Sequence, residues 1–398
     1  MEYFMDYKIK KEFRIIKDNY KKMFHSGTKE FGFLWETYAD LFYDMKQIGL
    51  DIPDEMDYPF NLDFFITDTG YNNYTQYCKD KLIEFNKMME EMIVTVEKIL
   101  EERDAEEGGG NHKMNRREKN IRIFNDTIEM VNENDKLLQS ITNTLNAQKL
   151  ILENDEVVVP DLAGDKDAKI IVSGKRTLEA ASSYSDKKVC VLNFASATNP
   201  GGGVEHGSSA QEESLCRCST LYFALISDKN NELKQSFYIP HRKANNPLYN
   251  DDIIYSPDVY VVKSDTSSPE RMNESDWYKV NVITCAAPNL RSKPSNEINS
   301  NAGDQPANIS DDELEKLLEK RIRRIVSVAA AEGNEVLILG AFGCGAFRNP
   351  PQIVAKAFHK VVAEFQKHFE VIEFAIFHTE YETENFKAFK REFDVESR

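Results

Sequence analysis

The chain has 398 residues, of which 41% are hydrophobic, and a formal net charge of −17. A chain of this length exceeds one small core, so we expect one large or two moderate domains. The negative charge argues against sequence-independent binding to nucleic acid, because a phosphate polymer would be repelled over most of the surface.

The sequence shows no sign of membrane insertion or secretion. It has no run of 18 apolar residues, and Met1–Asp6 lack the basic and apolar regions of a signal peptide. Six cysteines follow no disulfide or zinc-finger spacing: Cys78, Cys190, Cys216, Cys218, Cys285 and Cys344. Six free thiols are therefore expected. We predict a soluble protein of the cytoplasm, or of the nucleus if the source is a eukaryote.

The first 105 residues are rich in Lys, Glu and aromatic residues. Their pattern predicts helices at residues 7–24, 33–48 and 77–102, interrupted by glycine and proline. We expect residues 1–105 to form a helical domain or cap with an aromatic core, and an adenine-stacking surface is the alternative. Residues 106–115 contain three consecutive glycines and predict a flexible linker.

An α/β pattern begins at Arg116 and continues to residue 398. It predicts a helix at residues 120–132, short strands at 157–159 and 170–172, and a short helix at 177–182. The apolar stretch from Lys188 to Phe194 then predicts a buried strand that runs into a loop.

The loop after this strand reads Asn199-Pro200-Gly201-Gly202-Gly203. Three glycines let the backbone approach a ligand closely, because no Cβ stands in the way and positive φ carries no steric penalty. Such a run at a strand end favours amide donors that face an anion.

A glutamate pair opens the next predicted helix, residues 211–226. Glu212 and Glu213 follow Gln211 in its first turn. Adjacent helical residues point about 100° apart, so the two carboxyl groups cannot share one task. One can face a ligand while the other supports it; alternatively, both only complement the helix dipole.

The rest of the chain alternates strands and helices. Strands are predicted at residues 253–255, 259–263, 280–286, 335–339 and 371–377, and helices at 314–331, 351–368 and 382–393. Ser310 is predicted to cap the first of these helices, and Pro351 to open the second. Residues 289–310 predict a long surface loop. This alternation indicates a parallel or mixed sheet covered on both faces, with ligands at the carboxyl ends of its strands.

A second glycine-rich segment, Gly340–Pro350, reads GAFGCGAFRNP and follows the predicted strand at residues 335–339. The amides of Gly201–Gly203 and Gly343–Gly345 could cradle a diphosphate, and Phe347 could stack on a purine. The alternatives are a tight strand-to-helix turn and a core phenylalanine. Both loops are expected on one rim of the sheet.

The two glycine loops and the Gln-Glu-Glu sequence resemble the signature of microbial-type poly(ADP-ribose) glycohydrolases, a branch of the macrodomain superfamily. The resemblance extends from about Arg116 to the C-terminus. It implies a macrodomain-like three-layer α/β/α sandwich with a mixed sheet, which would make residues 116–398 the catalytic domain.

The resemblance also implies the roles of individual residues. Glu213 would be the general acid that protonates the ribose–ribose glycosidic oxygen and then the base toward water. Glu212 would bond ribose hydroxyls, Asn199 the distal ribose, and a diphosphate of the substrate could stabilise the positive charge at the reacting carbon. The implied substrate-binding residues are Asn199, Gly201, Gly202, Gly203, Gln211, Gly343, Cys344, Gly345, Ala346 and Phe347.

The expected activity is hydrolysis of poly(ADP-ribose) with release of ADP-ribose, without metal or cofactor. The residues also allow two other chemistries. Cys216 and Cys218 with His206 could hold a metal, but the two cysteines point about 200° apart on a helix. Cys344 with His378 could be a nucleophile, although backbone crowding also explains a small residue there.

Two alternative functions stay open at this stage. One is a hydrolase of mono-ADP-ribosyl linkages on protein or nucleic acid, and the other is a non-catalytic reader of ADP-ribose. An intact Gln-Glu-Glu favours an enzyme, because a reader needs only the glycine loops. Sequence-specific nucleic-acid binding and membrane association are not expected, and the sequence names no partner for the N-terminal domain.

Overall fold

The computed structural model describes residues 115–161, 166–226, 233–296, 300–381 and 383–394. They belong to the compact unit Met114–Arg398. The helices predicted at residues 7–24, 33–48 and 77–102 and nearly all of the predicted linker lie outside the described residues. None of the described helices is both long and apolar enough to cross a membrane.

A seven-stranded mixed sheet forms the centre of this unit, in the order β1-β4-β5-β3-β6-β7-β2. Its strands are β1 (Lys149–Ile151), β2 (Lys169–Ser173), β3 (Val189–Phe194), β4 (Ile253–Val261), β5 (Tyr278–Cys285), β6 (Val336–Leu339) and β7 (Val371–Ala375). Strands β5, β3, β6, β7 and β2 pair in parallel, whereas β4 is antiparallel to both β5 and β1. The predicted mixed sheet is confirmed.

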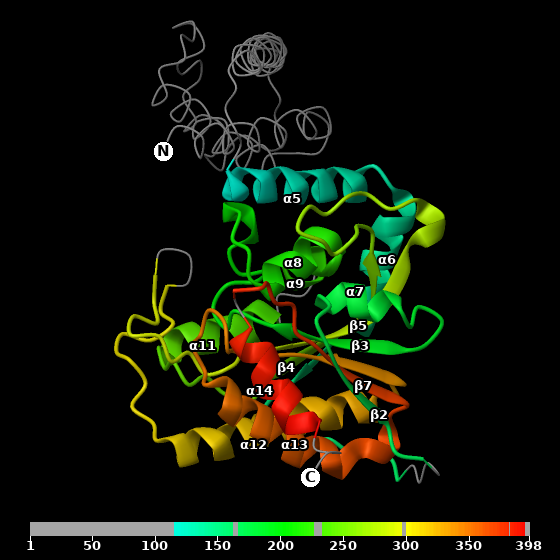
Figure 1. The fold of residues 1–398 in the computed structure, drawn as a ribbon. Helices are drawn as coiled ribbons and strands as arrows, with labels where there is room; N and C mark the ends of the chain where they lie inside the picture. The colour runs from blue at the N-terminus through cyan, green and yellow to red at the C-terminus, as the bar shows by residue number, and fades with distance from the viewer. Residues whose placement is uncertain (1–114, 162–165, 227–232, 297–299, 382, 395–398) are drawn as a thin grey trace, which may run out of the picture. The chain divides into compact units, whose positions relative to one another are not determined.

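Helices cover both faces of the sheet (Figure 1). They are α5 (Arg116–Asn132), α6 (Asp135–Ala147), α7 (Thr177–Ser182), α8 (Gln211–Cys218), α9 (Leu221–Ile226), α11 (Ile239–Ala244), α12 (Asp311–Ala331), α13 (Pro351–Phe365) and α14 (Glu384–Phe393). Alternate residues of β3 point to opposite faces, since Cys190 and Leu192 pack with α12 and α13 while Val189 and Val191 pack with α7 and α8. The two cores on either side of one sheet confirm the three-layer sandwich.

Several local signals in the sequence predicted the ends of helices correctly. Ser310 caps α12 in a capping box with Glu313, and Pro351 is the first residue of α13. The short helix at residues 177–182 has the predicted bounds. These signals work because capping depends on residues only a few positions apart.

The helix predicted at residues 211–226 is wrong in one respect, because it is broken in the middle. Ser219 is extended (φ −146°, ψ 175°) and forms an isolated β-bridge with Val261. Its hydroxyl donates back to the carbonyl of Leu215 at 2.7 Å. The pairing of Ser219 with a distant strand therefore interrupts the helix that the periodicity predicts, and a new helix, α9, begins at Leu221.

Two further differences concern the sheet, and one concerns a helix. Residues 157–159 form no strand, and the edge strand is instead β1. The strands predicted at 253–255 and 259–263 are one strand, β4, with an irregularity between Ser256 and Val259. Helix α6 was not predicted.

Candidate active site

A cavity of about 350 Å³ lies at the carboxyl ends of the central parallel strands. The segments that follow β3, β6 and β7 line it together with the start of α8. Strands β3 and β6 are hydrogen-bonded neighbours, so both glycine loops leave the sheet at one edge, as expected. Eight of the predicted site residues line the cavity: Gly202, Gln211, Glu212, Glu213, Gly343, Gly345, Ala346 and Phe347.

Both oxygens of the buried Glu212 accept hydrogen bonds within the protein. Oε1 accepts from Nδ2 of Asn193 at 3.2 Å, and Oε2 accepts from the backbone amide of Ser196 at 2.7 Å. Burial and then the neighbouring Glu213 raise the pKa of Glu212 to about 8. This side chain links the first turn of α8 to the end of β3.

Glu213 is held differently, although it is equally buried. Its Oε1 accepts from the amide of Gly203 at 2.9 Å, while its Oε2 is buried without a hydrogen-bond partner of good geometry. Burial raises the pKa of Glu213, and the backbone amides of Gly203, Glu213 and Ala210 oppose that shift. Glu213, which lines the cavity, therefore has one anchored oxygen and one buried oxygen whose hydrogen-bonding capacity the protein leaves unused.

Gly202 makes room for both carboxylates. It has a left-handed backbone (φ +60°), and a Cβ at this position would stand 2.6 Å from Oε1 of Glu213 and 3.1 Å from Oε2 of Glu212. No side chain fits there without displacing Glu213. The middle glycine of the first loop is thus required by the position of the acidic pair.

The amides of the first loop are already used inside the protein. Gly202 donates to the carbonyl of Asn199 at 2.9 Å, and Gly203 donates to Glu213. The side chain of Asn199 donates to the carbonyl of Gly202, and neither Asn199, Gly201 nor Gly203 lines the cavity. In this structure the first loop holds the carboxylates rather than offering its amides to an anion.

Gln211 also acts through the protein framework. Its Oε1 accepts from the amide of Phe194 at 2.9 Å, and its Nε2 donates to the carbonyl of Leu192 at 2.8 Å and to the hydroxyl of Thr177 at 3.1 Å. These bonds fix α8 to the last residues of β3. Although Gln211 lines the cavity, both N–H donors of its amide and one lone pair of its oxygen are used to position α8.

The second loop presents unused amides. The backbone N–H groups of Gly343, Gly345, Ala346 and Phe347 have no acceptor among the residues that the structure describes. Gly343 is left-handed (φ +75°), and a Cβ there would lie 2.5 Å from Nδ2 of Asn349. That nitrogen donates to the carbonyl of Gly343 at 3.1 Å and closes the turn. The arrangement is typical of an anion-binding turn.

Cys344 does not line the cavity. Burial raises the pKa of its thiol well above the usual range, so it stays neutral and is a poor nucleophile. Cys216 and Cys218 are both buried on α8, and no group of three metal-ligating side chains occurs among the described residues.

Comparison with known proteins identifies the family. The sequence model of the microbial-type PARG catalytic domain matches residues 111–264. The structure of poly(ADP-ribose) glycohydrolase (PARG) from Thermomonospora curvata is 28% identical, with a TM-score of 0.58, and the match covers 69% of this chain and 99% of that one. The PARG from Deinococcus radiodurans in complex with ADP-ribose is 30% identical, with a TM-score of 0.51, and the match covers 64% of this chain and 97% of that one. This chain belongs to the microbial-type PARG family. No curated protein matches it.

Helix α5 contacts the segment that follows the first glycine loop. Arg117 Nε donates to the carbonyl of His206 at 2.7 Å, and Asn120 Nδ2 donates to that of Gly207 at 3.0 Å. Gly207 is left-handed (φ +70°), and a Cβ there would stand 2.3 Å from the carbonyl oxygen of Arg117. Helix α5 therefore packs directly on the turn between the first glycine loop and α8.

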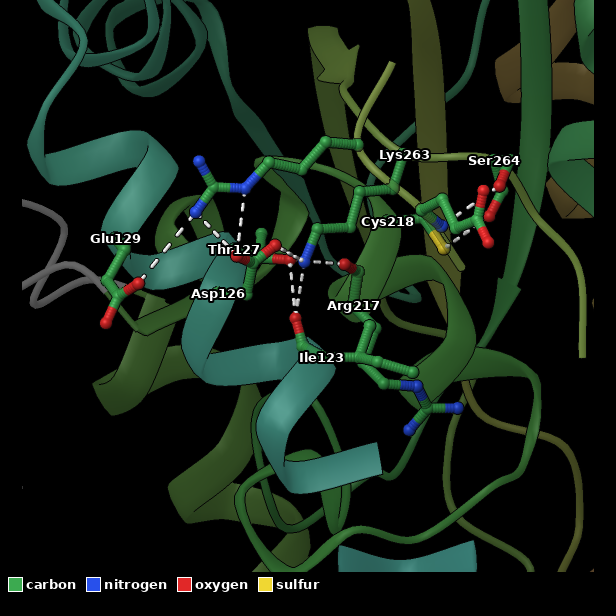
Figure 2. A network of polar contacts seen from close by, with 10 residues as sticks. Ile123, Asp126, Thr127, Glu129, Arg217, Cys218, Lys263 and Ser264 are labelled. Carbon is green, nitrogen blue, oxygen red and sulfur yellow. Dashed lines mark hydrogen bonds and ion pairs between the residues drawn. The ribbon is translucent and has the colours of Figure 1, made fainter. Parts of the chain in front are cut away.

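A partly buried ion pair attaches α5 to the segment after β4 (Figure 2). Lys263 Nζ lies 2.7 Å from Asp126 Oδ2 and donates to the carbonyl of Ile123 at 2.5 Å. The hydroxyl of Thr127 donates to the carbonyl of Arg217, near the end of α8, at 2.5 Å. The PARG fold thus secures α8 from its outer side as well as through Gln211.

Sequence reasoning missed several residues that line the cavity, among them Arg176, Asp265 and Phe377. The guanidinium of Arg176 lies 3.9 Å from the ring centroid of Phe377, whose surface is 49% exposed. Asp265 is buried, accepts from the amide of Leu178 at 2.9 Å, and has its pKa raised by that burial. Phe377 comes just after β7, so the rule that sites lie beyond parallel strands could have found it.

Proposed function

We propose that this chain hydrolyses poly(ADP-ribose) and releases ADP-ribose, with Glu213 as the general acid and base. The observation that carries the proposal is the buried carboxyl of Glu213, whose pKa is raised and whose Oε2 has no hydrogen-bond partner. Relatives support the substrate: the T. curvata enzyme has been solved with the inhibitor ADP-HPD, and the D. radiodurans enzyme with ADP-ribose.

The raised pKa suits the first chemical step. A protonated Glu213 donates its proton to the glycosidic oxygen while the bond from that oxygen to the ribose carbon breaks, which leaves an oxocarbenium-like sugar. The Glu213 carboxylate then takes a proton from water, and the water oxygen bonds to the sugar carbon. The acid is regenerated, and one water is consumed for each bond that is cleaved. A diphosphate of the substrate stabilises the positive charge.

The other site residues divide between orientation and binding. Glu212 lines the cavity and can accept more hydrogen bonds than the two it accepts from Asn193 and Ser196, so ribose hydroxyls can donate to it. The four unpartnered amides of the second loop suit the diphosphate. Phe347 and the half-exposed Phe377 provide rings for the sugar and purine portions. Asn199, Gly201 and Gly203 shape the loop that carries the acid.

The test is Glu213→Gln, which keeps the size of the side chain and the acceptor for Gly203. We expect turnover to fall roughly a thousandfold, because general acid–base catalysis contributes about that much, while ADP-ribose still binds. Chromatography of ADP-ribose released from poly(ADP-ribose) and calorimetry measure the two quantities. The control is Glu153→Gln, an exposed glutamate outside the cavity. A Glu213→Gln enzyme as fast as wild type contradicts the assignment.

The division of the chain and its location are also proposals. We propose a helical N-terminal domain at residues 1–105, a linker at 106–115 and the catalytic domain at 116–398. A cytoplasmic location is supported by five cysteines that are free thiols in the described residues: Cys190, Cys216, Cys218, Cys285 and Cys344.

A further inference from the structure

Arg291 is a cationic side chain that lines the cavity without a protein partner. It lies between β5 and α12 and is partly buried. Its guanidinium forms no hydrogen bond or ion pair with any residue that the structure describes. The other arginine of the cavity, Arg176, is placed over the ring of Phe377. A guanidinium has five N–H donors, so a partly buried one at a binding site points to an acceptor that the protein does not provide.

The backbone around Arg291 is held by hydrogen bonds within the predicted long loop. Asn289 is buried, and its Oδ1 accepts from the amide of Arg291 at 3.3 Å. Its Nδ2 donates to the carbonyl of Pro294 and to the hydroxyl of Tyr249, both at 3.3 Å. Its own amide donates to the carbonyl of Pro247 at 2.7 Å. Arg291 therefore projects from a structured turn.

This turn is attached to the second glycine loop. The amide of Leu290 donates to the carbonyl of Phe347 at 2.9 Å, and the ring of Phe347 lies 6.1 Å from that of Tyr249. Arg291 therefore directly follows Leu290, the residue whose backbone bonds to the second glycine loop. The unpartnered amides of that loop carry no net charge, so Arg291 adds a positive charge beside them.

We propose that Arg291 is a substrate-binding residue that donates to the diphosphate of the ADP-ribose unit held by the second loop. The inference rests on the proposed function and names a contact beyond it. A guanidinium matches phosphate oxygens with two parallel N–H donors, and such charge-assisted bonds are stronger than neutral ones. In a chain of net charge −17, one cation at the binding position offsets repulsion where the anion sits.

The experiment titrates ADP-ribose and adenosine into the full-length chain by calorimetry. Arg291→Ala should weaken ADP-ribose binding about tenfold or more, because a hydrogen bond to a charged group is lost. Arg291→Lys should lose less, since it keeps the charge but not the paired donors. Adenosine has no phosphate, so its affinity should not change. Lys293→Ala removes the same charge from an exposed position two residues away and should leave both affinities within twofold.

The outcomes separate this inference from the proposed function. If wild type binds ADP-ribose and Arg291→Ala binds it equally well, the inference is wrong while the function stands. The same holds if only the Michaelis constant for the polymer rises, because the arginine then contacts a neighbouring unit. Equal losses for ADP-ribose and adenosine also overturn it, since they indicate a distorted cavity. A wild-type chain that releases no ADP-ribose from the polymer refutes the function itself.

Discussion

Two adjacent glutamates of similar burial acquire different chemical capacities from their hydrogen bonds. Glu212 has a backbone amide and a side-chain amide on separate oxygens, whereas Glu213 has one anchored oxygen and one without a partner. Two carboxyl groups this close cannot both be charged without cost, so the pair retains a proton near neutral pH. The sequence predicted only that they face different ways. The hydrogen bonds give an independent reason to assign the acid to Glu213.

At the residue scale, Gly202→Ala tests whether the glycine is needed for the acid. The new methyl would collide with Oε1 of Glu213, so we expect about a hundredfold loss of turnover from misplacement of the acid. Gly333→Ala is the matched control, because Gly333 is also left-handed (φ +65°) but a Cβ there meets nothing within 4 Å. Both variants should lose about 1 kcal/mol of stability from backbone strain. A comparable loss of turnover in both variants would show that the steric argument is wrong.

The position of the site could be predicted from the sequence. Which of its donors and acceptors bond within the protein, and which stay free for a ligand, could not be predicted. Consecutive residues define the two glycine loops and the acidic pair, so the motifs are visible in the chain. The internal bonds of Gln211 and of the Gly203 amide depend on which way donors point after folding. Arg291 joins the site through contacts between segments far apart in sequence, and no local pattern marks it.

At the scale of elements, tertiary contacts decided the features that periodicity predicted wrongly. The helix expected at residues 211–226 breaks where Ser219 pairs with Val261. The expected strand at 157–159 finds no partner, whereas the short β1 pairs with β4. Long buried strands and capped helices were predicted well, because their signals are local and strong.

The ion pair between Asp126 of α5 and the buried Lys263 should contribute to stability. Asp126→Ala leaves the ammonium of Lys263, which is 1% exposed, without its carboxylate. We expect a loss of roughly 2 kcal/mol, below the roughly 3–5 kcal/mol of a fully buried pair because Asp126 is 38% exposed. Lys263→Met should cost less, since Asp126 keeps its bonds to Arg271. Urea unfolding of both variants and the double mutant measures this order, and the reverse order would contradict it.

At the scale of the whole molecule, an acidic chain acts on an acidic polymer. A net charge of −17 means that attraction must come from a small region, and the free amides of the second loop attract phosphate without formal charge. A protein that binds a polyanion through few ionic contacts loses less affinity at high salt than a protein with a broad basic face.

We therefore expect weak salt dependence of poly(ADP-ribose) binding by the full chain. Each phosphate neutralised by a side chain adds about 0.7 to the slope of log affinity against log salt, as in single-stranded nucleic acids, so a slope of about 1–2 is predicted. Binding isotherms with Glu213→Gln, in which slow turnover is expected, measure the slope between low and physiological salt. A slope near 5 or above would reveal an extensive basic surface instead.

The hydrogen bond between Gly203 and Glu213 links the shape of a loop to an acidity. That amide favours the ionised carboxylate, so it lowers the proton affinity of Glu213 as long as it stays in place. A bound ligand that accepts the hydrogen bond of the Gly203 N–H would remove this effect, and the pKa of Glu213 would rise. Binding of the sugar would then also raise the pKa of Glu213, so that the acid is protonated when the substrate is in place.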